Sequence, residues 1–174
     1  MAGERSLAVK VAYLGFADPG DGVPGTVFKQ YPIIEEGSVT LNFNDPTSVD
    51  FRAEGLDDPW ESFDKSGDAD SIDFNIPSPT AEEIKDFCGG TITGDKWEAP
   101  VSMPSIRKTM KIQTAEYKNK FTEYVFANCK ITAKFNQFPS AEQTDLLQVR
   151  VTKLAAVAAD GTIGSPWSRE VKDA

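Results

Sequence analysis

Apolar and polar residues alternate with a period of two through most of this chain, and this alternation limits the folds open to it. In residues 38–43, SVTLNF, the apolar residues Val39, Leu41 and Phe43 alternate with polar ones. The same pattern recurs in residues 7–13, 47–53, 71–76, 105–112, 120–135 and 146–154. Successive side chains of a strand point to opposite faces, so the pattern predicts strands with one buried face and one solvated face. We expect seven to nine strands.

Two of these segments carry further predictions. The turn residues Asn44-Asp45-Pro46 separate residues 38–43 from 47–53, which favours a β-hairpin made of those two segments. Residues 120–135 keep the alternation for far longer than the five or six residues of a usual strand. We therefore expect that strand either to run past the body of the domain or to break near Asn128.

A single segment, SPTAEEIKDFCGG, follows the helical period instead. Thr80 and Glu83 have the spacing of a capping box, and Gly89-Gly90 is typical of a helix end. One apolar stripe is formed by Ala81, Ile84, Phe87 and Cys88. The chain is therefore predicted to be mainly β: a β-sandwich or partly closed barrel with one short flanking α-helix at about residues 80–88.

The chain has 174 residues, which predicts a single domain spanning residues 1–174. Residues 164–174 show little alternation, and we expect a flexible tail or an arm that orders on a neighbour. No apolar run reaches the length of a membrane span, and the N-terminus lacks a signal-peptide pattern, so we expect no membrane contact and a cytoplasmic protein.

Histidine is absent, and this narrows the possible chemistry. Without it the chain has no Ser–His–Asp or Cys–His arrangement and no His-ligated metal site. The two cysteines, Cys88 and Cys129, stand far apart in the sequence and fit small buried residues in a reducing compartment. We expect no enzymatic activity, no cofactor and no metal.

Charge is distributed unevenly along the chain. The net charge is −9, which disfavours binding to nucleic acid through its phosphates. Residues 1–100 contain 20 acidic and 7 basic residues, and residues 101–174 contain 7 acidic and 11 basic residues. Such an asymmetry suits a protein whose acidic face docks on the basic face of another copy.

The stretch GLDDPWESFDKSGDADSIDF, residues 55–74, concentrates the acidic residues. Asp64, Ser66, Asp68 and Asp70 have the spacing of calcium ligands, but Gly67 is misplaced and Asn75 stands where an EF-hand loop has a glutamate. A carboxylate pair for glycoside hydrolysis is an unspecific signal in a chain with 27 acidic residues. Neither a metal site nor a catalytic pair is favoured.

We interpret residues 54–70 instead as a long acidic loop that contacts another protein, since aromatic anchors within a polar rim are typical of such contacts. The basic run of residues 107–120 is a candidate receptor for it on another copy. The alternatives are a solvated loop and a solvated basic strand. The candidate contact residues are Asp57, Asp58, Trp60, Glu61, Phe63, Asp64, Arg107, Lys108 and Lys111.

The order of these segments resembles that of the major tail tube proteins of long-tailed bacteriophages, a family that shares its fold with the tube protein of type VI secretion systems. The resemblance covers residues 7–163. It lies in the succession of EEGSVTLNFNDPTSVDFRAEG, LDDPWESFDKSGDAD, SIDFNIP, SPTAEEIKDFCGG, KITAKFNQF and LLQVRVTKLAAVAADGTIG.

The resemblance implies a structural virion protein that is assembled in the cytoplasm of a bacterial host. Its copies would form rings, usually hexameric, that stack into a hollow tube for DNA ejection, with DNA as transient cargo that is not bound. Residues 54–70 would reach a neighbouring subunit, and the partners would be other copies and further tail proteins such as the tape measure and the terminator. Alternatives are another ring-forming tail component, such as a terminator or connector, and a monomeric β-sandwich that binds carbohydrate through Trp60, Trp97 or Trp167.

Overall fold

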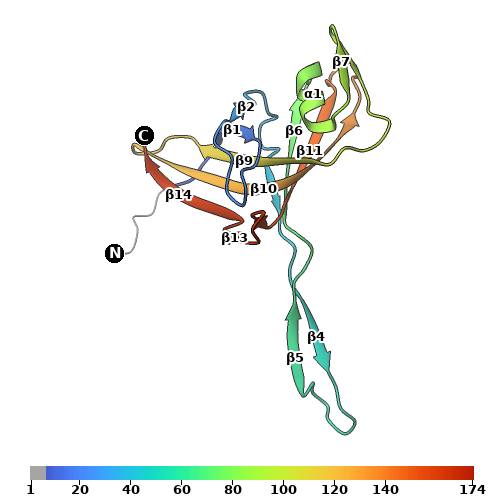
Figure 1. The fold of residues 1–174 in the computed structure, drawn as a ribbon, viewed down its shortest axis with the longest axis vertical. Helices are drawn as coiled ribbons and strands as arrows, with labels where there is room; N and C mark the ends of the chain where they lie inside the picture. Colours follow the sequence, from blue (N-terminus) through green and yellow to red (C-terminus); the bar gives the residue numbers. More distant parts are fainter. Residues whose placement is uncertain (1–6) are drawn as a thin grey trace.

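The computed structural model describes residues 7–174, and it is mainly β, as the alternation predicts. An antiparallel sheet has the strand order β2-β1-β9-β10-β11-β6-β3, and β14 pairs with β10 beside this path. Within the described residues the sheet does not close into a barrel, and its curvature gives a sandwich-like fold (Figure 1). These strands are β1 Val11–Ala17, β2 Lys29–Gln30, β3 Thr40–Asn42, β6 Ser71–Pro77, β9 Ile106–Thr114, β10 Lys120–Gln137, β11 Leu146–Lys153 and β14 Trp167–Asp173.

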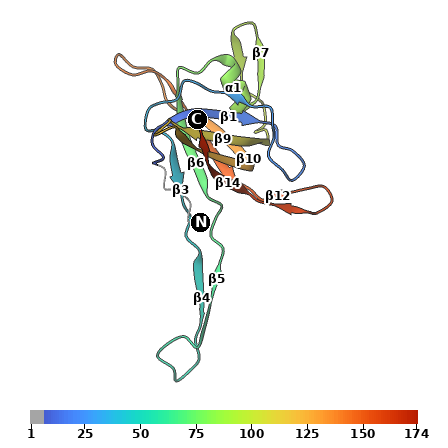
Figure 2. The same cartoon turned by 90° about the vertical axis from the view of Figure 1, so that its left-hand side faces the viewer.

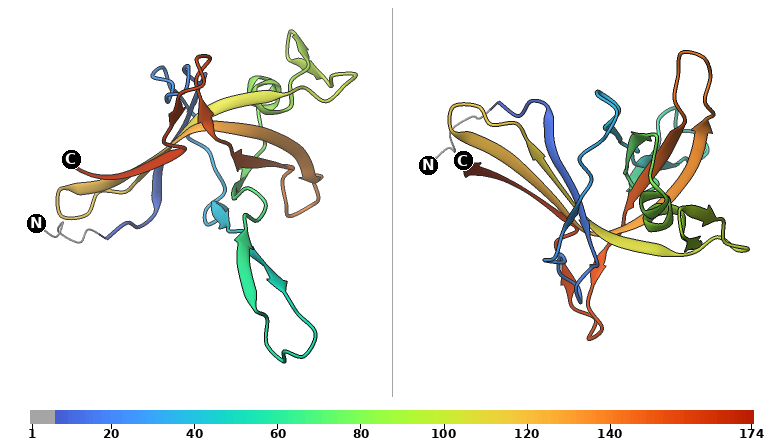
Figure 3. Two further views of the ribbon diagram at one scale, coloured as in Figure 1. Left: turned by 60° about the horizontal axis from the view of Figure 1, so that its bottom comes forward. Right: turned by 90° about the horizontal axis from the view of Figure 1, so that it is seen from above.

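Strand β10 belongs to both halves of the sheet. Its first part, residues 120–126, pairs with β14, and residues 129–137 pair with β11, while β9 pairs with both parts. The β9 register shifts between Phe126 and Cys129, and the side-chain amide of Asn128 donates a hydrogen bond to the Ala155 carbonyl over 3.0 Å. The strand therefore continues past Asn128, but its neighbour changes there. Figure 3 shows that the strands of the sheet fan apart toward its two ends.

The hydrophobic core lies between the inner faces of the two halves. Phe74, Ile76, Met110, Leu147 and Val149 are completely buried there. The Phe16 ring meets the Phe87 ring edge-on at a centroid separation of 5.2 Å. The Phe87 ring also meets the Phe74 ring of β6 at 6.0 Å between centroids, so Phe87 attaches the helix to both β1 and β6.

The helix itself, α1 Ala81–Cys88, confirms the prediction from the capping box. The Glu83 N–H donates to the Thr80 hydroxyl over 3.3 Å, and the Glu83 carboxylate accepts from the Thr80 N–H over 2.8 Å. Beyond α1 lies the small hairpin β7 Thr91–Thr93 and β8 Lys96–Glu98, and a second small hairpin joins β12 Ala156–Val157 to β13 Ile163–Gly164 (Figure 2).

The hairpin predicted from residues 38–43 and 47–53 is wrong. Strand β3 pairs with β6, whereas β4 Thr47–Phe51 pairs with β5 Glu61–Lys65. Residues 54–70, predicted as a loop, thus contain a strand. An alternating segment has the same pattern whether it belongs to a sheet packed on the core or to a free two-stranded ribbon. The pattern alone therefore does not show which strand it pairs with.

The two ends of the described chain also differ from the predicted pattern. The first strand begins at Val11 and not at residue 7, because Lys10 has a φ of 54°, which interrupts the extended backbone. At the other end, residues 167–173 form β14 along β10, and Trp167 stacks on Phe126 at 5.8 Å between ring centroids. The strand is mostly exposed and charged, which explains its weak alternation.

Candidate assembly interface

The acidic stretch lies on a two-stranded ribbon that projects from the body of the protein. We call residues 45–68 the arm. It consists of β4, β5 and the tip between them, and Figures 1 and 2 show it extending away from the sheet. Every residue of β4 and β5 is exposed. The arm contains eight acidic and two basic residues, and its net charge is therefore −6.

The two faces of the arm differ in chemistry. The register places Val49 opposite Phe63, and the Phe51 ring stacks on the Phe63 ring at 5.9 Å between centroids. Trp60 adds to this aromatic face at 6.3 Å from Phe51. On the other face the Ser48 hydroxyl donates to Asp64 over 3.0 Å, and the Ser62 hydroxyl donates to Asp50 over 2.7 Å.

The aromatic face has no cover within one copy of the described chain. Trp60 is 61% exposed and Phe63 is 51% exposed. A two-stranded hairpin alone is marginally stable in water, and contiguous exposed apolar residues mark contact surfaces. The arm therefore has the composition of a surface that gains stability when another molecule covers it.

Polar contacts fix the arm to the sheet at its root, where Asn44 precedes the arm and Asp70 follows it. The Asp70 carboxylate accepts from the Asn44 N–H over 3.1 Å and pairs with the Lys153 ammonium over 2.7 Å. The hydrogen bond from Lys153, with that from the Asn44 N–H, holds the pKa of Asp70 below its usual range. Gly67 lies so close to the Asp45 carbonyl that a Cβ would stand 2.4 Å from its oxygen. These contacts hold the arm directed away from its own body.

The structure separates the predicted contact residues into two groups. Asp57, Asp58 and Trp60 lie at the tip of the arm, and Glu61, Phe63 and Asp64 lie on β5. The three basic residues lie on β9 in the body. Within residues 7–174, no ion pair joins the arm to β9, so a contact between the two groups requires a second copy.

Two of the three basic residues already have contacts inside the subunit. The Lys108 ammonium pairs with Asp18 over 2.6 Å, and this hydrogen bond lowers the pKa of the Asp18 carboxyl. The Lys111 ammonium stands over the Phe28 ring at 4.0 Å from its centroid. Arg107 is exposed. Of these three residues, Arg107 is the one that is open to solvent without such a contact in the described part of the chain.

The acidic residues with calcium-like spacing do not come together to form a metal site. Asp64 lies on β5 and bonds to Ser48, whereas Asp70 is occupied by Lys153 at the arm root. Among the described residues no group of three or more His, Cys, Asp or Glu side chains is placed to hold a metal ion.

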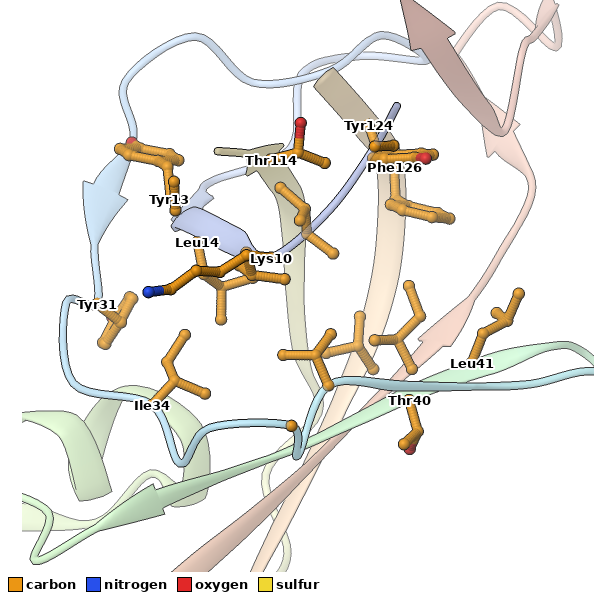
Figure 4. Close-up of a pocket in the computed structure, with 18 of the residues that line it drawn as sticks. Lys10, Tyr13, Leu14, Tyr31, Ile34, Thr40, Leu41, Thr114, Tyr124 and Phe126 are labelled. Atoms are coloured by element: carbon orange, nitrogen blue, oxygen red, sulfur yellow. The ribbon is translucent and has the colours of Figure 1, made fainter. Parts of the chain in front are cut away.

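A large apolar cavity, which the sequence did not predict, lies where the halves of the sheet diverge. It has a volume of about 1090 Å³ and is lined by residues of β1, β3 and the segment before it, β6, β9, β10, β11 and β14. Figure 4 shows Leu14, Ile34, Leu41 and Phe126 around it. The alternation assigned Leu41 and Phe43 to an inward face, and both do line this cavity, but each is about two-thirds exposed at its rim.

The three tryptophans lie on three different elements. Trp60 is on the arm, Trp167 begins β14, and Trp97 on β8 donates its indole N–H to the Gly89 carbonyl over 2.8 Å. Trp97 and Trp167 therefore have packing roles inside the subunit, and Trp60 is the most exposed of the three.

Neither a protein-family model nor a curated protein matches this chain. Among the described residues, no helix is both long enough and apolar enough to cross a membrane.

Proposed function

We propose that this protein is a structural subunit that assembles with copies of itself through the arm, as the tail tube subunit of a long-tailed phage. In this proposal the copies form rings that stack into a hollow conduit for DNA. The observation that carries it is the aromatic face of the arm, which is exposed on a ribbon fixed at its root. A contact between copies is the simplest cover for a surface that every copy presents.

The edges of the sheet support assembly as well. The strand β14 runs along β10 for seven residues, and its other side is not part of the sheet path in the described chain. At the two ends of that path, β2 has two residues and β3 has three, and such short strands leave little edge to pair, so β14 is the edge offered to another copy. Unpaired edges form hydrogen bonds with other strands unless they are blocked, and closure into a ring removes them.

The negative net charge of the chain is consistent with a conduit that lets DNA pass without binding it. A conduit must not retain its cargo, and a net charge of −9 disfavours the binding of phosphates.

Negative-stain electron microscopy with light scattering tests the proposal. The wild-type protein is expected to form rings or tubes with a central hole. The variant W60S/F63S removes two aromatic anchors, and we expect it to remain monomeric under the same conditions. The variant S48A/S62A, altered on the opposite face of the arm, is the matched control and is expected to assemble.

Each other outcome has a defined meaning. Assembly of W60S/F63S as readily as the wild type would overturn the role of the arm. Rings that never stack would instead identify a terminator or connector. A wild-type monomer at all concentrations that binds glycans, with binding lost on substitution of Trp60, would replace the proposal by a carbohydrate-binding module.

A further inference from the structure

A basic surface lies on the outward side of the sheet, assembled from three strands. On β10, Cys129 and Ile131 point into the core, so the alternate residues Lys130, Thr132 and Lys134 point outward. The register places Arg107 of β9 beside Lys130, and Arg150 of β11 beside Thr132. We call Arg107, Lys130, Lys134 and Arg150 the basic face.

This face has few carboxylates of its own. Arg150 donates two hydrogen bonds to Asp73 on β6, over 2.9 and 2.8 Å, and its side chain is still 57% exposed. Within residues 7–174, Arg107, Lys130 and Lys134 have no ion-pair partner. Four positive groups are thus grouped on a solvated sheet face in a chain whose net charge is negative.

The chemistry of the arm complements this face. The arm has a net charge of −6, and its aromatic rings lie on the same ribbon as Glu61 and Asp64. Guanidinium and ammonium groups bind carboxylates, and they also bind the faces of aromatic rings. Their long aliphatic chains can pack against apolar side chains while the charge stays in water.

We propose that the basic face is the docking surface for the arm of a second copy. The proposal rests on the proposed function, since it names the receptor of the same arm. It also replaces the basic run of β9 as the receptor, because Lys108 and Lys111 are engaged inside the subunit and Arg107 alone joins the basic face. The face could not be recognised as a run in the sequence, because its four residues are brought together by strand pairing.

The arm and the basic face are different patches of one molecule. A contact between them is heterologous, and repetition of such a contact gives rings when it closes and filaments when it does not. The root contacts at Asp70 and Asn44 direct the arm away from its own body, which favours a contact between copies over one within a copy.

A charge-reversal experiment tests the receptor. The variant K130E/K134E is expected to raise the protein concentration at which assembly begins by at least about tenfold, because like charges then face each other. The control K96E/K118E makes the same change of net charge outside the basic face and is expected to assemble as the wild type does. Circular dichroism and thermal unfolding verify that each variant is folded.

A mixing experiment tests whether the arm of one copy contacts the basic face of another. At a protein concentration just above that at which the wild type begins to assemble, the arm variant D57K/D58K/E61K and the face variant K130E/K134E are each expected to stay unassembled alone. An equimolar mixture is expected to assemble, because the lysines introduced at the arm tip of one variant then face the glutamates introduced on the sheet of the other. Light scattering of the two variants and of their mixture measures this directly.

The outcomes separate this proposal from the proposed function. A wild-type protein that does not assemble overturns both. If the wild type assembles, W60S/F63S does not, and K130E/K134E does, the arm keeps its role and the basic face loses its own. A 30-base-pair DNA duplex is the competing occupant, tested by fluorescence anisotropy. Loss of duplex binding in K130E/K134E with assembly unchanged would assign the face to nucleic acid and overturn the proposal.

Discussion

The strand β6 and the arm have the same kind of sequence and opposite environments. Both alternate apolar and polar residues, as SIDFNI in β6 and TSVDF in β4 show. Yet Phe74 of β6 is completely buried, whereas Phe51 and Phe63 of the arm are about half exposed. Alternation specifies which side chains share a face of a strand. Whether that face is covered depends on which elements pack against it, and no element of the described chain covers the aromatic face of the arm.

The largest expected effect contrasts the two regions directly. Phe74→Ala should lower the free energy of unfolding by about 3–5 kcal/mol, because it opens a cavity in the core. Phe63→Ala should change it by less than about 0.5 kcal/mol, because that ring is exposed in one copy. Urea unfolding of dilute protein measures both values. A comparable decrease in unfolding free energy for both variants would show that the arm packs on the body of its own subunit.

The root of the arm gives a smaller effect that depends on pH. The pKa of Asp70 in the folded protein is below its ordinary value of 3.8, since Lys153 and the Asn44 N–H favour the ionised carboxylate. Its contribution is therefore fully present above about pH 3.8 and is lost as the pH falls through the folded pKa. Asp70→Asn should cost about 1.5 kcal/mol at pH 7, and less at pH 3.

The difference in unfolding free energy between the wild type and D70N, followed from pH 7 to pH 2.5, isolates this carboxylate from the other titrating groups. A difference that stays constant over this range would argue against an ionised Asp70 at the arm root.

The helix cap is expected to matter slightly less. Thr80→Ala removes the hydroxyl that accepts from the Glu83 N–H, and the loss should be about 1 kcal/mol. Thr80→Ser retains the hydroxyl and should recover most of it. Thermal unfolding of the two variants checks this, and equal stabilities would mean that the cap contributes nothing beyond the packing of Phe87.

The smallest effects belong to single charges on the arm. Each reversal at Asp57, Asp58 or Glu61 should weaken assembly by less than about 1 kcal/mol, because exposed ion pairs are screened by water and salt. The triple variant should assemble less readily than the wild type, with an unchanged unfolding transition. Salt screens exposed charges, so 0.5 M salt should reduce the difference between the triple variant and the wild type. Unchanged assembly of the triple Lys variant at low salt would remove the acidic tip from the contact.

Local signals in the sequence were sufficient to predict the helix. Its cap, its apolar stripe and its terminal glycines all lie within thirteen residues, and the structure confirms each of them. The alternation also predicted most of the sheet strands, but β10 does not break near Asn128: it continues through that residue while its neighbour changes from β14 to β11.

These local signals could not predict which strands pair when they lie far apart in the sequence. Residues 47–51 could pair with the preceding or the following segment, and nothing local favoured β5. The basic face joins Arg107, Lys130 and Arg150 across three strands, so no window of the sequence contains it. The cavity arises from the divergence of the sheet, a property of its curvature, which a pattern of residues does not encode.

Amide hydrogen exchange of the arm, measured in dilute and in concentrated protein, tests most directly whether the arm is covered by other copies. We predict that the amides of β4 and β5 exchange rapidly in dilute protein and become protected when the protein assembles, whereas those of β6 are protected in both states. An assembled protein whose arm amides exchange as rapidly as in the monomer would contradict the proposal that copies of this chain join through the arm.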